Sequence, residues 1–159
     1  MGTQKATFGA GCFWGVEAAF AVTPGVTATA VGFEGGKLKH PSYKDVCTDQ
    51  TGHAEVVELD FDPETVSYEQ LLDAYFELHD PTTLNHQGPD WGTQYRSVIF
   101  FHSPEQEVQA RAKIEQLTAE GRFKPRSIVT QVVAADVFWR AEDYHQRYLE
   151  KRGLATCHF

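Results

Sequence analysis

The cysteine at position 12 is the residue of this chain best placed to do chemistry. It lies in the segment Gly11-Cys12-Phe13-Trp14-Gly15, where a strand-like run gives way to a helix-like run. The first backbone N–H groups of a helix lack intrahelical partners and carry partial positive charge, which favours a nucleophilic thiolate. The sequence therefore predicts a reactive thiol, with Phe13 and Trp14 forming an apolar wall beside it. A small residue buried at a tight turn is the plainer alternative.

Glu55 is the second residue that points to chemistry. Residues 53–61 alternate in polarity, so Glu55 shares a face with the apolar Val57, Leu59 and Phe61. Burial raises the pKa of a carboxyl, which would make Glu55 a proton donor near neutral pH. The alternative is an exposed position at the tip of the strand, or a pair with a basic side chain.

Two phenols and one further carboxylate lie in segments that could complete a site. Tyr43 and Tyr95 could donate hydrogen bonds to a developing oxyanion, although tyrosines are also common in protein cores. Asp90 lies in a long stretch with glycines on either side, where capping a turn is the simpler explanation.

The other two cysteines differ in what their positions predict. Cys47 lies in a loop, and we expect a small packed residue there. Cys157 lies in a tail of about residues 153–159, from which it could reach a second sulfur as a resolving thiol. An incidental free thiol is the alternative for Cys157. The seven histidines show no ligand spacing with the cysteines, so we expect no metal site.

The surrounding elements must hold these residues in place. Apolar periodicity and helix-start signals predict strands over residues 4–10, 26–33, 53–61, 95–102 and 128–134, and helices over 13–21, from 67, over 103–121 and over 142–151. The first six elements run βαββαβ. This order predicts an α+β fold with a ferredoxin-like, split βαβ two-layer core, a mainly antiparallel sheet, extra helices and long irregular loops.

Length, charge and composition exclude several classes of protein. The 159 residues favour one domain over 1–159, and a net charge of −8 without a basic block argues against nucleic acid as a partner. The apolar runs are too short to span a membrane. An odd cysteine count and the lack of a signal-peptide pattern predict a cytoplasmic protein. We expect a monomer without a bound cofactor.

Five ordered motifs resemble the peptide methionine sulfoxide reductase A family, and together they span nearly the whole chain. They are Gly11-Cys12-Phe13-Trp14-Gly15, Thr51-Gly52-His53-Ala54-Glu55-Val56-Val57, Asp80-Pro81-Thr82-Thr83, Gly92-Thr93-Gln94-Tyr95-Arg96-Ser97 and Ala141-Glu142-Asp143-Tyr144-His145-Gln146.

The resemblance implies a role for each candidate residue. Cys12 matches the nucleophile and Glu55 the proton donor. Phe13 and Trp14 match the apolar wall that receives the methyl group of the sulfoxide, and Tyr43 and Tyr95 match the phenols that hold its oxygen. Asp90 matches an acidic residue that helps to organise this polar end of the pocket, and Cys157 lies where the family keeps its resolving cysteines.

The resemblance also implies an activity. Methionine S-sulfoxide, free or in oxidised proteins, would be reduced as a repair of oxidative stress, leaving a sulfenic acid and then a Cys12–Cys157 disulfide. Thioredoxin or a similar dithiol would be the external reductant, and no metal or bound cofactor is implied. The chain departs from the family pattern at Thr48-Asp49, Trp91 and Arg140, and it has one tail cysteine where some relatives have two.

Two other classes of function fit parts of the pattern. One is a thiol peroxidase or redox sensor that uses Cys12 and Cys157 without a sulfoxide pocket. The other is a non-enzymatic module that binds methionine-rich peptides. Comparing peroxide with a methionine sulfoxide peptide as oxidant separates these from a reductase.

Overall fold

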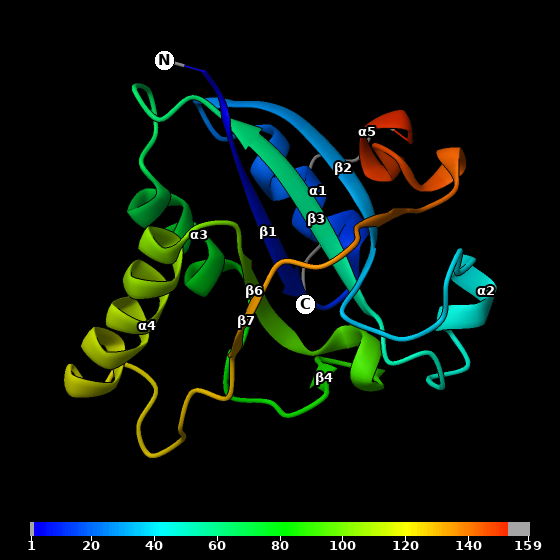
Figure 1. Ribbon diagram of the computed structural model, residues 1–159. Helices are drawn as coiled ribbons and strands as arrows, with labels where there is room; N and C mark the ends of the chain where they lie inside the picture. Colours follow the sequence, from blue (N-terminus) through cyan, green and yellow to red (C-terminus); the bar gives the residue numbers. More distant parts are fainter. Residues whose placement is uncertain (1, 153–159) are drawn as a thin grey trace.

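The computed structural model describes residues 2–152, so the predicted tail at 153–159 lies outside the described part of the chain. A six-stranded sheet forms the centre of the molecule (Figure 1), with strand order β7-β6-β1-β3-β2-β8. Its strands are β1 (Gln4–Ala10), β2 (Val26–Glu34), β3 (Ala54–Phe61), β6 (Ser97–Phe101), β7 (Gln131–Ala134) and β8 (Trp139–Arg140). All neighbours pair antiparallel except β6 and β7, which are parallel. The expected α+β class with a mainly antiparallel sheet is confirmed.

The helices are α1 (Phe13–Ala21), α2 (Tyr43–Val46), α3 (Tyr68–Leu78), α4 (Pro104–Ala119) and α5 (Tyr148–Lys151). Ser67 caps α3 through a capping box with Gln70, as the spacing predicts. Ser103 caps α4, but Gln106 does not complete a box there. Its side-chain oxygen accepts from the N–H of His102 instead.

The main core lies between the sheet and helices α1 and α3. Its largest buried side chains are the aromatic and aliphatic residues Tyr75, Phe8, Phe13, Phe20, Phe33, Phe61, Phe76, Leu59, Leu71, Leu72 and Ile99. A smaller cluster lies on the opposite face, where Val56, Val98 and Phe100 are covered by Phe138. Figure 1 shows the chain after β7 crossing that face. Residues of β6 enter both clusters, because this strand lies between β7 and β1 and is covered on both faces.

The segment predicted as a helix over 142–151 is broken in two. A single 3₁₀ turn, η2 (Asp143–His145), precedes α5, and Arg147 between them has φ 55°. This left-handed backbone cannot continue a right-handed helix, so the predicted continuous helix is wrong. The predicted strands at 95–102 and 128–134 are shorter than expected, and Thr93–Tyr95 forms a 3₁₀ turn, η1.

The long stretch at 79–94 is ordered by a small hairpin of two-residue strands, β4 (His86–Gln87) and β5 (Asp90–Trp91). No helix within residues 2–152 is both long enough and apolar enough to cross a membrane.

Candidate active site

Cys12 is the N-cap residue of α1 and is separated from the end of β1 only by Gly11, which confirms its expected place at a helix start. Gly11 makes this sharp turn with φ 93°, a conformation that L side chains rarely adopt. A Cβ on Gly11 would also lie 2.8 Å from Cβ of Gln87. Glycine is therefore required both by the backbone angle and by the side chain packed behind it.

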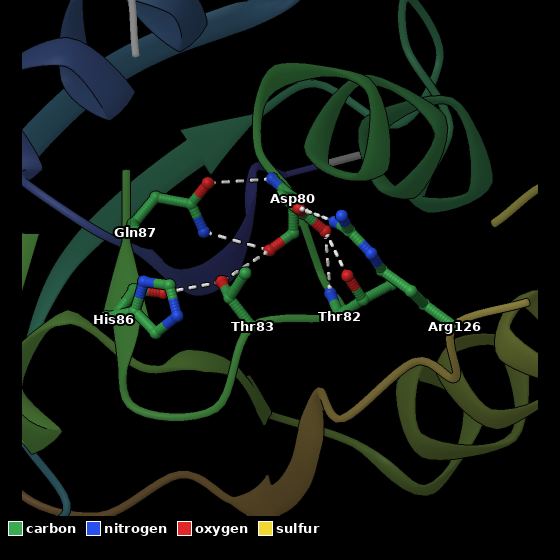
Figure 2. A network of polar contacts seen from close by, with 6 residues as sticks. All are labelled: Asp80, Thr82, Thr83, His86, Gln87 and Arg126. Carbon is green, nitrogen blue, oxygen red and sulfur yellow. Dashed lines mark hydrogen bonds and ion pairs between the residues drawn. The ribbon is translucent and has the colours of Figure 1, made fainter. Parts of the chain in front are cut away.

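Gln87 is held behind Gly11 by the segment that follows α3 (Figure 2). Its side-chain amide accepts from the N–H of Asp80 at 2.8 Å and donates to the carbonyl of the same residue at 2.9 Å. The Asp80 carboxylate in turn accepts from the Thr82 N–H and forms an ion pair with Arg126 at 3.3 Å. This network fixes the surface against which the backbone before Cys12 rests.

Glu55 lies on β3 with only 1% of its surface exposed. Its Oε1 accepts from the backbone N–H of Phe13 at 3.1 Å, at the first turn of α1 and one residue after the candidate nucleophile. Its Oε2 has no hydrogen-bond partner among the described residues. Burial, opposed by the Phe13 N–H and reinforced by the charge of Asp90, raises the pKa of Glu55 to about 8. The expected burial of Glu55 on the apolar face of its strand is confirmed, and the alternative of an exposed position at the strand tip is wrong.

The two candidate phenols are electrostatically coupled to Glu55. Burial, followed by the field of Glu55, raises the pKa of both Tyr43 and Tyr95, the latter to about 12. Both hydroxyls therefore keep their protons at physiological pH and can donate hydrogen bonds. Asp90 on β5 contributes to the raised pKa of Tyr95 as well as of Glu55.

Two turns carry these phenols, and one side chain joins the turns. Tyr43 begins α2, which Ser42 caps, and Tyr95 ends η1. Asp49, which follows α2, accepts from the backbone N–H of Thr93 at 2.8 Å and from the hydroxyl of the same residue. The departure from the family pattern at Thr48-Asp49 thus places a carboxylate where it links the Tyr43 turn to the Tyr95 turn.

The rings of the two residues that follow Cys12 pack against aromatic rings from other elements. Phe13 is buried and packs on Phe33 at a centroid distance of 5.7 Å. The half-buried Trp14 stacks on Tyr148 of α5 at 3.9 Å with an interplanar angle of 12°. Phe13 also stacks on Tyr43 at 6.1 Å, which joins the apolar wall to the polar end of the site.

Comparison of the whole chain with known proteins points to the same thiol chemistry as the geometry of the site. A sequence model described as peptide methionine sulfoxide reductase matches residues 4–159. The peptide methionine sulfoxide reductase MsrA of Acidobacterium capsulatum is 73% identical over 154 residues, which is 97% of this chain and 98% of that protein. The chain belongs to the peptide methionine sulfoxide reductase family.

Solved structures agree with the family. Mxr1 from Saccharomyces cerevisiae in reduced form is similar with a TM-score of 0.90 and 34% identity, covering 99% of this chain and 92% of that one. Mxr1 in complex with Trx2 gives a TM-score of 0.64 and 22% identity, covering 92% of this chain and 85% of that one. As a member of this reductase family, the protein is an oxidoreductase.

The structure corrects the expectation for Cys47. This residue is exposed at the end of α2, and its thiol hydrogen-bonds to the side chains of Tyr43 and Gln94. Cys47 is the residue that caps the C-terminus of α2 and is not packed in the core, because the preceding residue, Val46, takes the buried position. Partial burial of the sulfur raises the pKa of Cys47. Cys157 lies outside the described residues.

Three residues that our sequence analysis did not single out belong to the site's surroundings. They are Gln87, Glu142 and His145. Glu142 and His145 lie in the family motif at residues 141–146, and membership of that motif is the only sequence feature that could have indicated them. Within residues 2–152, no group of three histidine, cysteine or acidic side chains could hold a metal ion.

Proposed function

We propose that this reductase acts on the S epimer of methionine sulfoxide, both free and in proteins, with Cys12 as nucleophile and Glu55 as proton donor. The main support for this proposal is the environment of the Glu55 carboxyl. It is buried, protonated near neutral pH, bonded through one oxygen to the residue after Cys12 and left with the other oxygen unpartnered.

The chemical step transfers one oxygen atom from substrate to enzyme. Sγ of Cys12 attacks the sulfoxide sulfur as a thiolate, and the S–O bond breaks as the oxygen passes to Cys12. Glu55 supplies the proton that this oxygen needs. Methionine leaves, and Cys12 is left as a sulfenic acid. The substrate sulfur is reduced by two electrons, and the cysteine sulfur is oxidised by two.

The other site residues stabilise this step. Tyr43 and Tyr95 donate hydrogen bonds to the sulfoxide oxygen, since their raised pKa values keep them protonated. Asp90 keeps Glu55 protonated through its negative charge. Phe13 and Trp14 receive the methyl group and thereby favour a methyl sulfoxide over peroxide.

Cys157 and a thioredoxin-type dithiol complete the cycle in this proposal. The Cys157 thiol condenses with the sulfenic acid of Cys12, which releases water and forms a disulfide. The dithiol then reduces that disulfide and is itself oxidised. Support comes from Mxr1, which is known in complex with Trx2.

Two cysteine variants test these assignments with S- and R-methionine sulfoxide as separate substrates. Cys12→Ser is expected to abolish reduction. Cys157→Ser is expected to release about one methionine per enzyme in a single turnover but not to cycle with thioredoxin. Cycling of Cys157→Ser at the wild-type rate would assign resolution to Cys47 or to an external thiol. Faster thiol loss with peroxide than with sulfoxide would favour a peroxidase or redox sensor.

We also propose a single domain with a ferredoxin-like core. The order β6-β1-β3-β2, with α1 after β1 and α3 after β3, supports a split βαβ arrangement. We expect a monomer in the cytoplasm, where a reducing environment can recycle a dithiol. Sedimentation analysis of the reduced protein tests the monomer.

A further inference from the structure

We propose that His145 is a positioning residue that holds the indole of Trp14 in place as a wall of the methyl-binding site. This inference rests on the proposed role of Trp14 in receiving the methyl group. The proposed mechanism gives His145 no part in the transfer of oxygen between the two sulfur atoms, so its effect passes through the indole.

The hydrogen bond between the two rings fixes the protonation of His145. Nε1 of Trp14 donates to Nδ1 of His145 at 2.9 Å. An indole N–H can only donate, so Nδ1 must be unprotonated and the neutral ring carries its proton on Nε2. That second nitrogen is buried without a hydrogen-bond partner in the described part of the chain. His145 is 1% exposed, so the hydrogen bond that Nδ1 accepts from Trp14 is the polar contact of this ring that the structure shows.

Aromatic rings enclose His145 on several sides. The nearest centroids are those of Tyr144 at 4.0 Å, Tyr43 at 4.3 Å, Phe13 at 5.3 Å and Trp14 at 5.6 Å. Burial among these rings lowers the pKa of His145, an effect that the charge of Glu142 opposes. The ring therefore stays neutral at physiological pH and remains an acceptor.

The backbone on both sides of His145 is pinned, which gives the acceptor a fixed place. We call residues 141–147 the strap. The Gln146 amide accepts from the Val31 N–H and donates to the Val31 carbonyl, both at 2.9 Å. Glu17 of α1 accepts from the N–H of Arg147 at 2.7 Å. The strap is therefore anchored to β2 and to the helix that carries Trp14.

The same strap also reaches the polar end of the site. The Glu142 carboxylate accepts from the backbone N–H of Tyr43 at 3.2 Å. One segment thus places both the indole that meets the methyl group and the helix start that carries a phenol. His145 is the part of the strap that fixes the indole.

Loss of the acceptor should weaken substrate binding more than chemistry. Trp14 would then be held chiefly by stacking on Tyr148, and its ring could turn away from the methyl position. Contact with the methyl group is made in both the ground state and the transition state, so KM should rise while kcat stays nearly constant. We expect KM for a methionine sulfoxide peptide to rise about tenfold, because a tenfold change in binding corresponds to the free energy that one hydrogen bond contributes.

Two variants separate the acceptor from the ring. His145→Phe keeps an aromatic ring and removes the acceptor, whereas His145→Asn places an amide oxygen near the position of Nδ1. The expected results are a raised KM for His145→Phe and a partial return toward wild type for His145→Asn. Tyr144→Phe, on the exposed neighbouring residue, is the control and should match wild type.

Nuclear magnetic resonance supplies a readout that does not depend on activity. The Trp14 indole N–H, assigned by its loss in Trp14→Phe, should shift in His145→Phe and return in His145→Asn. The imidazole nitrogens of wild type should report the proton on Nε2. A wild-type proton on Nδ1, an unmoved indole signal, an unchanged KM or a loss confined to kcat would overturn the proposal. If wild type does not reduce sulfoxide, the proposed function fails, while the indole and tautomer measurements still decide the geometry.

Discussion

At the scale of single residues, the protonation of Glu55 is a balance of opposed effects. The Phe13 N–H stabilises the carboxylate, whereas burial and the charge of Asp90 favour the neutral acid, and the neutral form prevails up to about pH 8. A carboxyl can therefore act as a proton donor in neutral solution only because β3 places it inside the protein.

Replacing Glu55 by glutamine should slow the chemical step by about 10²–10⁴-fold near neutral pH, since the side chain can no longer supply a proton. The wild-type rate should fall as pH rises through about 8 because Glu55 then loses its proton. Glu55→Gln cannot titrate, so its residual rate should lack this fall. Single-turnover release of methionine from pH 6 to 9.5 measures both.

Asp90→Asn serves as the matched variant for this pH effect. Removing its charge lowers the pKa of Glu55, so the fall should begin at lower pH while the rate at pH 6 changes little. A pH profile of Asp90→Asn that coincides with that of wild type would remove Asp90 from the polar end of the site.

At the scale of elements, the turn between β1 and α1 depends on a glycine. Gly11 has φ 93°, and a methyl group there would meet Gln87 at 2.8 Å. We expect Gly11→Ala to lower the free energy of unfolding by about 1–3 kcal/mol and to slow sulfoxide-dependent oxidation of Cys12, because the turn must shift. Urea unfolding and thiol titration are the measurements.

Gly52→Ala controls for backbone strain alone. Gly52 also has positive φ, 77°, but its added Cβ would come no closer than 3.4 Å to Cα of Gly36 and 4.0 Å to the backbone nitrogen of Lys37, which are ordinary contacts. Gly52→Ala should lower the free energy of unfolding without slowing the sulfoxide-dependent oxidation of Cys12. Equal loss of Cys12 reactivity in the two variants would mean that the Gln87 contact has no special part in placing the nucleophile.

Short-range patterns were sufficient to predict most elements around the site. The alternation of polar and apolar residues over 53–61 predicted that Glu55 lies on the buried face of its strand. The spacing between Ser67 and Gln70 predicted the start of α3. The break at Arg147 was not predictable, because its left-handed backbone follows from tertiary anchoring rather than from residue type. The contacts of His145 and Cys47 join segments far apart in sequence, and no local pattern encodes them.

At the scale of the whole molecule, Glu34 connects the sheet to the chain that crosses its second face. It is 1% exposed, and its Oε2 accepts from the N–H of Asp136 at 2.8 Å. Burial, opposed by that hydrogen bond, raises the pKa of Glu34 from 4.5 to about 7. Its contribution to stability is therefore fully present below about pH 4.5 and is lost as pH rises through about 7.

Glu34→Gln should remove this pH dependence, because an amide stays neutral and can still accept from Asp136. Between pH 5 and 8, the free energy of unfolding of wild type should fall relative to the variant by about 1–3 kcal/mol. Glu55 titrates in the same range, so the comparison is best made in a Glu55→Gln background. The exposed Glu105→Gln is the control. Parallel curves for Glu34→Gln and its parent would contradict a neutral Glu34.

The anchoring of the strap on β2 has a consequence for solubility as well as for catalysis. The Val31 N–H donates to the side chain of Gln146, and the Val31 carbonyl accepts from both the Gln146 side chain and the Ala141 N–H. Among the described residues, the edge strand β8 pairs with β2 only at Gly32 and Phe33. Without the strap, the backbone groups of Val31 would be open, and open groups of this kind are templates for edge-to-edge aggregation. Gln146 occupies the position that a strand of another molecule could otherwise take, so the residue next to His145 also blocks edge-to-edge pairing at this part of β2.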